Sequence, residues 1–387
     1  MFLANRLRDH RMPLDPADAE CLGAAGAAEA ERFLQHRENY AVTPLHTLSA
    51  LASHLGVADI HVKDEGPRFG LGSFKALGGS YAVTRLVLEA ASQQLKRSVH
   101  IGELHDSEIR ALAATMTFAC ATDGNHGRSV AQGAQLVGAR AVIFVHAGVS
   151  DERVAAIAHF GAEIVKVAGT YDDSVAEAAR VAAARGWIIV SDTSWPGYER
   201  IPGLVMQGYT VMVREALRQI PDLPTHVFVQ AGVGGVAAAV AGHLAAVFGN
   251  RRPTFVVVEP ERAACIYVSA EAGRPVKIDH DQPTVMAMLE CYEPSLIAWR
   301  VLSRVADGFM TVGEDDAVAA MRMLARPLGS DPPIIAGESG GVGLSGLLRA
   351  TADRDVSGVL GLGPRSRVFI INTEGATDPA RYAELVG

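Results

Sequence analysis

One lysine in this sequence stands where covalent chemistry is possible. Lys75 follows two glycines, Gly70 and Gly72, and precedes a segment, 76–91, whose apolar residues recur every three or four positions, which predicts a helix. The first turn of a helix lies at the positive end of its dipole, so the neutral amine is favoured there, and burial adds to the effect. A neutral amine is the form that makes Schiff bases. A surface lysine at a helix start is the alternative, but the chain contains only five lysines.

Two aspartates follow predicted strands and could bind a charged ligand. Asp123 lies in the loop Ala121-Thr-Asp-Gly-Asn-His-Gly127, which opens a predicted helix, and Asp192 lies in Ser-Asp-Thr-Ser-Trp. Ligands of open α/β sheets bind at the carboxyl ends of strands, where loop amides and helix N-termini favour anions such as a carboxylate. The same residue types are common in turns and helix N-caps, so each loop taken alone leaves both interpretations open.

A glycine-rich loop, Ala231-Gly-Val-Gly-Gly-Val236, links a predicted strand to a predicted helix. Its backbone N–H groups could hold a phosphate at the helix N-terminus. Gly232, Gly234 and Ala237 also match the dinucleotide pattern G-x-G-x-x-A, and Glu259 ends the next predicted strand, where a ribose-binding acid is expected. An NAD-dependent dehydrogenase is therefore an alternative, although it leaves the lysine and the first aspartate loop without a role.

The elements that must position these residues alternate between strand and helix. Such alternation implies parallel strands with helices on both faces, and therefore an α/β fold. We expect a large domain of residues 1–85 and 197–387 and a small inserted domain of residues 86–196, with the ligand site in the cleft between them. The predicted strands are 60–63, 115–121, 141–146, 162–167, 187–191, 226–229, 255–258 and 367–372, and the predicted helices are 48–55, 76–91, 128–137, 151–159, 172–185, 204–219 and 236–248, with further helices through 325.

Composition narrows the class of protein. The 387 residues are 49% apolar, which is enough for a substantial core, and the net charge of −8 argues against nucleic-acid binding. Four cysteines without CxxC spacing and no recognisable signal peptide indicate a reducing cytoplasm, although a Cys265–Cys291 disulfide stays possible. Segment 227–248 is nearly free of charge, but its glycine-rich loop favours a buried strand–loop–helix over a membrane span. We expect no metal ion.

Taken together, the motifs resemble a known family. Gly72-Ser-Phe-Lys75 followed by Gly78-Gly79 resembles the lysine motif of the fold-type II pyridoxal-phosphate (PLP) enzymes, the group that includes threonine dehydratases and tryptophan synthase β chains. Within that family, the dehydratases usually have a serine where this chain has Asp123, whereas the 2,3-diaminopropionate ammonia-lyases have the aspartate. Asp-Thr-Ser-Trp around Asp192 resembles a second aspartate site of the ammonia-lyases.

The resemblance implies a role for each candidate residue. Lys75 would bind the cofactor and remove the α-proton, and Asp123 would act as an acid or base from the opposite face, so the two could serve opposite enantiomers. Asp192 would recognise the distal amine, and Asn125 would bond the phenolic oxygen of the cofactor. Expected cofactor-binding residues are Phe74, Lys75, Asn125, Gly232, Val233, Gly234 and Gly235, with Thr373 or, as second choice, Ser339 at the pyridine nitrogen; expected substrate-binding residues are Ser73, Asp123, Gly124, His126, Tyr171 and Asp192.

The reaction that the resemblance implies is α,β-elimination of ammonia from 2,3-diaminopropionate, giving pyruvate and two ammonia. The implied partner is thus a small amino acid, and the implied assembly is a homodimer. Met288 and Tyr292 stand where the family suggests small glycines, so they would narrow or reshape the pocket. A serine or threonine dehydratase and a β-replacement synthase are alternatives on the same scaffold, and a PLP- or amino-acid-binding protein without catalysis is another.

Overall fold

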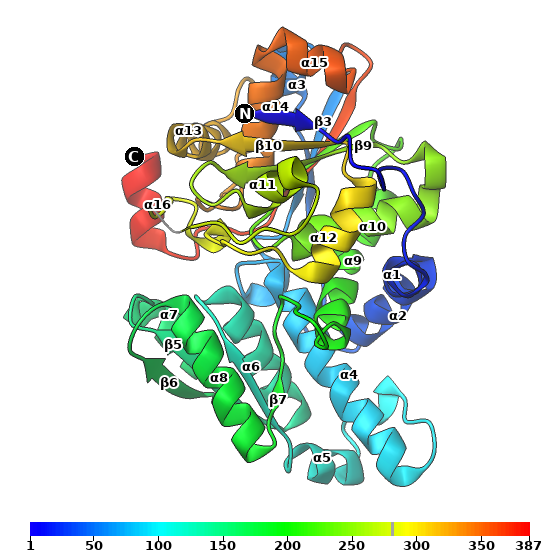
Figure 1. Cartoon of the computed structure of the whole chain (residues 1–387), viewed down its shortest axis with the longest axis vertical. Coiled ribbons are helices and arrows are strands. Elements are labelled where there is room, and N and C mark those ends of the chain that lie inside the picture. Colours follow the sequence, from blue (N-terminus) through cyan, green and yellow to red (C-terminus); the bar gives the residue numbers. More distant parts are fainter. Residues whose placement is uncertain (280–281) are drawn as a thin grey trace.

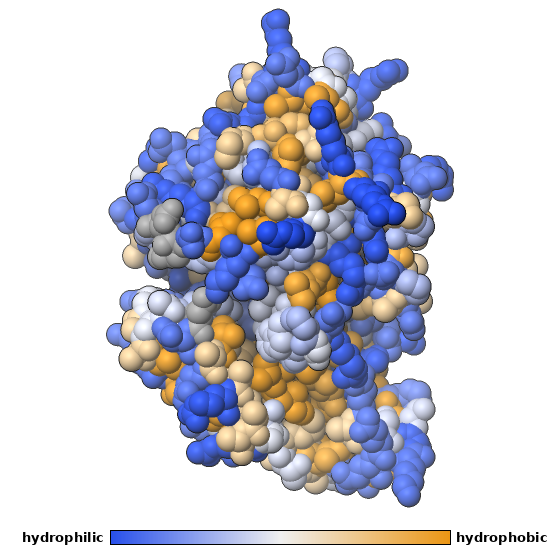
Figure 2. Space-filling view, viewed as in Figure 1, coloured by the Kyte–Doolittle hydropathy of each residue, from blue (hydrophilic) through white to orange (hydrophobic). Residues whose placement is uncertain are grey.

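A computed structural model describes residues 1–279 and 282–387 of the chain. Within these residues, the strands form two separate sheets, which lie in the upper and lower parts of the molecule in Figure 1. The sheets are mostly parallel and are flanked by helices, so the predicted α/β class is confirmed. Figure 2 shows hydrophilic side chains over much of one face of the molecule, with apolar side chains reaching the surface in separate patches.

The larger sheet has the strand order β1-β10-β9-β8-β11-β3-β2 in the described part of the chain. Its inner strands are parallel, and the two edge strands pair antiparallel with their neighbours. Apolar residues prevail in β8, β9, β10 and β11, in keeping with helices on both faces of a parallel sheet, whereas β3 contains Asp59, His61, Lys63 and Asp64. The strands are β1 (Phe2–Ala4), β2 (Leu45–Thr47), β3 (Asp59–Asp64), β8 (His226–Gln230), β9 (Thr254–Pro260), β10 (Gly308–Val312) and β11 (Arg367–Asn372).

The smaller sheet is parallel throughout and has the order β6-β5-β4-β7. Strand and helix alternate along this part of the chain, as the sequence predicts. The strands are β4 (Thr117–Ala121), β5 (Arg140–His146), β6 (Glu163–Val167) and β7 (Ile188–Ile189), and the helices between them are α6 (Asn125–Val137), α7 (Asp151–Ala158) and α8 (Tyr171–Arg185).

Helix α4 (Lys75–Leu95) runs from the middle of the molecule down beside the smaller sheet in Figure 1. It packs against α6 on one side and against α9 (Arg200–Gln219) on the other. The predicted Gly78–Gly79 pair explains how close these helices come. A Cβ on Gly78 would lie 2.4 Å from the ring of Tyr209 in α9, and a Cβ on Gly79 would lie 2.7 Å from the hydroxyl of Ser129 in α6. Both glycines therefore serve helix packing.

The remaining helices cover the sheets. They are α1 (Pro16–Leu22), α2 (Ala24–Gln35), α3 (Ser49–Leu55), α5 (Ser107–Ala113), α10 (Gly235–Phe248), α11 (Cys265–Ala272), α12 (Leu296–Val305), α13 (Glu314–Ala325), α14 (Val342–Ala352), α15 (Arg354–Leu360) and α16 (Pro379–Val386).

The structure corrects three features of the sequence-based interpretation. The prediction of helices through residue 325 is wrong at 308–312, where β10 forms a fully buried strand. Strands β1 and β2 were not predicted, because short edge strands have too few residues to show a pattern. The possible Cys265–Cys291 disulfide is absent, since all four cysteines are free and Cys265 lies 3.7 Å from the carbonyl oxygen of Gly232.

Segment 227–248 forms β8 and α10, so the predicted buried strand–loop–helix is confirmed. Among residues 1–279 and 282–387, no helix combines the length and the apolar character that a bilayer crossing requires.

A buried ionic network fixes the start of the lysine loop. Arg68 is fully buried and contacts Glu65 at 2.8 Å and Glu215 of α9 at 2.6 Å. Lys63, at the end of β3, contacts the same Glu215 at 2.8 Å. Burial alone would raise the pKa of Glu215, but the hydrogen bonds and charges of Arg68 and Lys63 outweigh it and lower that pKa to about 2. The network therefore joins β3, the lysine loop and α9.

We expect Glu215→Ala to lower the free energy of unfolding by about 3–5 kcal/mol, because it leaves the buried cations Arg68 and Lys63 without their shared partner. Urea unfolding followed by circular dichroism measures the change. Glu384→Ala is the control, since Glu384 pairs with Arg381 on the exposed side of α16 and its loss should cost less than about 0.5 kcal/mol. Equal stabilities for the two variants would contradict this account of the network.

Candidate active site

A cavity of about 870 Å³, counting its opening to solvent, brings together residues from both sheets. Its walls come from loops at the carboxyl ends of parallel strands, where ligands of open α/β sheets bind. Of the residues predicted from the sequence, those that line the cavity are Phe74, Lys75, Asp123, Gly124, Asn125, His126, Tyr171, Asp192, Gly232, Val233, Gly234, Gly235, Ser339 and Thr373.

Ser73 is the predicted site residue that does not line the cavity. Its hydroxyl oxygen accepts a hydrogen bond from the backbone N–H of Lys75 at 3.3 Å, and its backbone pairs with Glu374 in an isolated bridge. Ser73 is buried behind the cavity wall, where it fixes the turn that presents Lys75.

Lys75 and Asp192 form a direct ion pair inside the cavity. Their side chains are 22% and 13% exposed. Burial opposes the charge of Lys75, but the negative charge of Asp192 outweighs it and raises the lysine pKa. Burial would likewise raise the pKa of Asp192, but Lys75 keeps it well below its usual range. The expectation of a neutral amine is therefore wrong for this arrangement, because helix dipole and burial count for less than the adjacent carboxylate.

His126 lies beside this ion pair. Its Nε2–H donates to the carbonyl oxygen of Val190 at 2.8 Å, so the proton of the neutral ring is on Nε2. Its Nδ1 lies 3.9 Å from Asp192 and is buried without a hydrogen-bond partner among the described residues. Burial lowers the pKa of His126, which favours the neutral ring with a lone pair on Nδ1 beside Asp192.

Asp123 lies on a more open wall and has a histidine partner that the sequence did not indicate. His146, the last residue of β5, accepts the N–H of Gly148 on Nδ1 at 3.1 Å and donates from Nε2 to Asp123 at 3.0 Å. This hydrogen bond raises the pKa of His146. Asp123 keeps a second oxygen available for a ligand, and its side chain is 35% exposed. Gly124 follows with a φ of 151°, a conformation open in practice to glycine alone.

The glycine-rich loop is shaped to admit a phosphate group. Gly234 has a φ of 95°, and a Cβ on Gly232 would lie 2.8 Å from the sulfur of Cys291. Helix α10 begins at Gly235, and the first N–H groups of a helix have no acceptor within it. Side chains at Gly232 and Gly234 would collide with the residues packed behind the loop, so the glycines let the backbone turn here, and the free N–H groups at the helix start form a cradle that favours an anion.

The dinucleotide interpretation of this loop is wrong. Glu259, the expected ribose-binding acid, is fully buried, and its two oxygens accept the N–H groups of Ile266 at 2.8 Å and Tyr267 at 2.7 Å. It therefore caps the start of α11. Burial raises the pKa of Glu259 to about 8.

Both candidates for the pyridine nitrogen line the cavity. The Thr373 hydroxyl oxygen accepts a hydrogen bond from the side-chain N–H of Gln230 at 2.8 Å, which leaves its hydroxyl hydrogen free to donate. The Ser339 hydroxyl oxygen accepts the backbone N–H of Met288 at 3.1 Å.

Of the two bulky residues named from the sequence, Met288 lines the cavity. Tyr292 is not among the lining residues, and its hydroxyl donates to Glu290 at 2.9 Å. Further lining residues that the sequence analysis missed are Tyr209, Gln230, Cys291 and Glu374.

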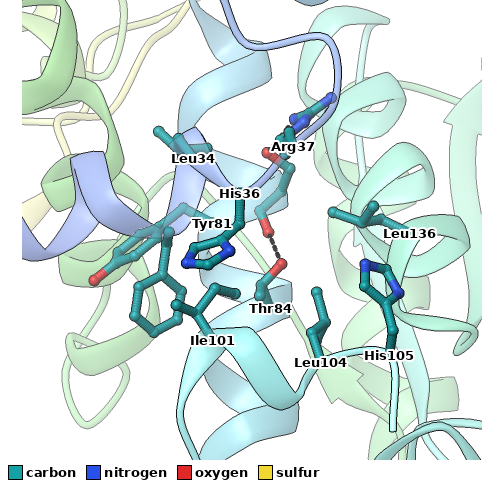
Figure 3. Close-up of a pocket in the computed structure, with 11 residues that line it drawn as sticks. Leu34, His36, Arg37, Tyr81, Thr84, Ile101, Leu104, His105 and Leu136 are labelled. Atoms are coloured by element: carbon teal, nitrogen blue, oxygen red, sulfur yellow. Dashed lines mark hydrogen bonds between the residues drawn. The ribbon is translucent and has the colours of Figure 1, made fainter.

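A second, smaller hollow lies between α2, α4 and α6 (Figure 3). His36 and His105 flank it, and the Thr84 hydroxyl donates to the carbonyl oxygen of Ser80 at 2.9 Å. No acidic residue is among those that line it. It lacks the lysine, the paired aspartates and the glycine loop, so the first cavity is the candidate active site.

Comparison with known proteins agrees with this geometry. Residues 37–373 match the family described as "Pyridoxal-phosphate dependent enzyme". The chain is 42% identical to diaminopropionate ammonia-lyase of Escherichia coli K12 over 92% of this chain and 90% of that protein, and 40% identical to the Salmonella typhimurium LT2 enzyme over the same shares. A crystal structure of the Escherichia coli enzyme with an aminoacrylate–PLP azomethine reaction intermediate matches with a TM-score of 0.89 and 38% identity, covering 100% of this chain and 96% of that one.

The match spans nearly the whole of both chains, in sequence and in structure alike. The matched structures have the fold-type II arrangement that the motifs predict. The chain thus belongs to the pyridoxal-phosphate dependent enzymes, in the family of the diaminopropionate ammonia-lyases.

Proposed function

We propose that this chain is a PLP-dependent carbon–nitrogen lyase that converts 2,3-diaminopropionate and one water into pyruvate and two ammonia. The observation that carries the proposal is the meeting of Lys75 with two aspartates, Asp123 and Asp192, in one cavity. Two carboxylates suit a substrate with two amino groups, because each can bind one ammonium group. Hydrogen bonds between ionised groups are stronger than those between neutral groups. The names of the relatives in Escherichia coli and Salmonella typhimurium support the same substrate.

PLP fits the residues that surround the cavity. We assign its covalent attachment to Lys75 and its phosphate to the cradle of Gly232, Val233, Gly234 and Gly235, where backbone N–H groups and the start of α10 favour an anion. Phe74 lines the wall beside Lys75. When bound, PLP supplies the electron sink that stabilises negative charge at the α-carbon.

Polar groups for the cofactor ring come from two further loops. We assign Asn125 to the phenolic oxygen and the Thr373 hydroxyl to the pyridine nitrogen, with Ser339 as the second choice. The support for Thr373 is its bond from Gln230, which occupies a lone pair and leaves the hydroxyl hydrogen free.

The remaining residues hold the substrate and move protons. Lys75 must give up its proton before it can attack, and the neutral His126, whose Nδ1 lies 3.9 Å from Asp192 beside the ion pair, would accept it, so that Asp192 stays ionised. Asp192 would then bind the distal ammonium of the substrate. Asp123, held through one oxygen by His146, would work from the other face with its second oxygen. The loop around Gly124 would receive the substrate carboxylate, and burial, by raising the pKa of Tyr171, keeps its phenol neutral at the cavity wall.

We also propose that residues 1–85 and 197–387 form a large PLP-binding domain and that residues 86–196 form a small inserted one. The two separate sheets support this division. A cytoplasmic location and a homodimer complete the proposal; the four free cysteines are in keeping with a reducing compartment.

The first test follows the visible spectrum of the purified protein while D- or L-2,3-diaminopropionate is added and pyruvate is measured. We expect an absorption band of lysine-bound PLP that changes on addition, with pyruvate and ammonia formed in a ratio of one to two. Serine and threonine are the comparison substrates. Faster turnover of either, or a band without pyruvate, would replace the proposed reaction by a dehydratase or a β-replacement synthase.

Lys75→Ala should abolish covalent cofactor attachment and lower pyruvate formation by about 10³-fold or more, because among the described residues that line the cavity no other lysine is present. Mass spectrometry after borohydride reduction detects the attachment. Lys166→Ala is the matched control, since Lys166 is 61% exposed and pairs with Asp151 on the surface. Retention of a reduced PLP adduct in Lys75→Ala would show that another lysine binds the cofactor.

Asp123→Asn should impair one enantiomer of diaminopropionate more than the other, by about 10²–10⁴-fold in kcat, because a base on one face can reach the α-proton of one isomer alone. Asp192→Asn should impair both, since the distal amine is common to them. Steady-state kinetics with each pure enantiomer measures the difference. Equal losses for both enantiomers in Asp123→Asn would contradict separate bases.

A further inference from the structure

Glu374 is a buried acid in the cavity wall that the proposed chemistry does not use. It follows Thr373 at the end of β11, and 2% of the residue is exposed. Its Oε2 accepts a hydrogen bond from the side-chain nitrogen of Asn125 at 2.7 Å. Its Oε1 is buried and has no hydrogen-bond partner in the described part of the chain. Burying a polar group costs free energy unless the group is hydrogen-bonded. A glutamate with an unpaired buried oxygen at this position therefore suggests a functional reason for the acid.

The backbone around Glu374 is fixed by the lysine loop. The N–H of Phe74 donates to the carbonyl oxygen of Thr373 at 2.9 Å, and the N–H of Gly375 donates to that of Gly72 at 3.0 Å. Between these bonds, Ser73 and Glu374 form an antiparallel bridge. The position from which the Glu374 side chain starts is thus set by the same loop that presents Lys75.

Asn125 reaches Glu374 from the other sheet. It is the first residue of α6, which follows β4 of the smaller sheet, and its side chain is buried. An asparagine amide carries two N–H donors, and Glu374 occupies one of them. The second donor remains available at the cavity wall.

Charged neighbours of Glu374 are engaged elsewhere. Arg153 lies 3.8 Å from Glu338, and Lys75 pairs with Asp192. Burial, together with the nearby Glu338, raises the pKa of Glu374 to about 8. A neutral carboxyl group has an acceptor oxygen for Asn125 and adds no negative charge beside an anionic cofactor.

We propose that Glu374 is a positioning residue for the cofactor: it holds the Asn125 side chain in place across the cavity, so that the second amide N–H of Asn125 is presented to the cofactor ring. The inference rests on the proposed placement of Asn125 at the phenolic oxygen. The new element is that the contact of Asn125, from the smaller sheet, depends on Glu374, which follows β11 of the larger sheet. Without that acceptor, Asn125 would have to be ordered when the cofactor binds, at a cost in side-chain entropy.

The test is a double-mutant cycle on cofactor binding. Apoprotein of the wild type, Glu374→Ala, Asn125→Ala and the double variant is titrated with PLP, and the dissociation constant and the wavelength of the visible band are recorded. We expect each single variant to weaken PLP binding by about 10-fold and to shift the band in the same direction. Because Glu374 acts through Asn125, the double variant should also lose about 10-fold.

Glu374→Gln is the rescue variant. Glutamine keeps a neutral side chain of the same length with an acceptor oxygen for Asn125, so PLP binding at pH 7 should stay within about twofold of the wild type. Circular dichroism of every apoprotein confirms that the variants are folded.

A loss of about 100-fold in the double variant would overturn the inference, because independent effects multiply. Glu374→Gln binding as weakly as Glu374→Ala would also overturn it, and so would unchanged PLP binding in Asn125→Ala. The titration needs no substrate. If the wild-type protein binds PLP but forms no pyruvate from diaminopropionate, only the proposed reaction is contradicted. The double-mutant cycle would still decide the role of Glu374.

Discussion

The close approach of three helices at two glycines is the constraint on which the rest of the site depends. Helix α4 starts with Lys75, and Gly78 and Gly79 in its first turns admit the Tyr209 ring from one side and Ser129 from the other. Larger residues at either position would push α9 or α6 away. Those two helices are packed beside the glycine cradle and the Asp123 loop, so their distance from α4 sets how far the lysine stands from both.

The cavity contains more acid than base. Lys75 is paired by Asp192, while Asp123 bonds to His146 and Glu374 bonds to Asn125. The three acids differ in environment. One is ionised against a cation, one is partly exposed to solvent, and one is buried and has its pKa raised. A single cleft therefore holds an acid ionised beside a cation, an acid open to solvent and an acid whose burial favours the protonated form.

The sequence predicts the parts of the site that lie within one loop. Strand–helix alternation places the Asp123 loop and the glycine loop at carboxyl strand ends, which explains why they meet. Contacts between segments far apart in the chain could not be predicted from the sequence. The ionisation of Lys75 depends on a carboxylate 117 residues away, and the bond from Asn125 to Glu374 spans 249 residues. Strand β10 was missed because periodicity cannot distinguish a short buried strand from a buried helix.

Helix α4 also connects the parts of the molecule that contain the two sheets. It contacts α9 at its start and α6 along its length, and within its described residues it passes from the larger sheet to the smaller one as a single helix of 21 residues. The two sheets are therefore spaced across one continuous helix, and Gly79, where a Cβ would lie 2.7 Å from the hydroxyl of Ser129, is a position at which α6 approaches that helix closely.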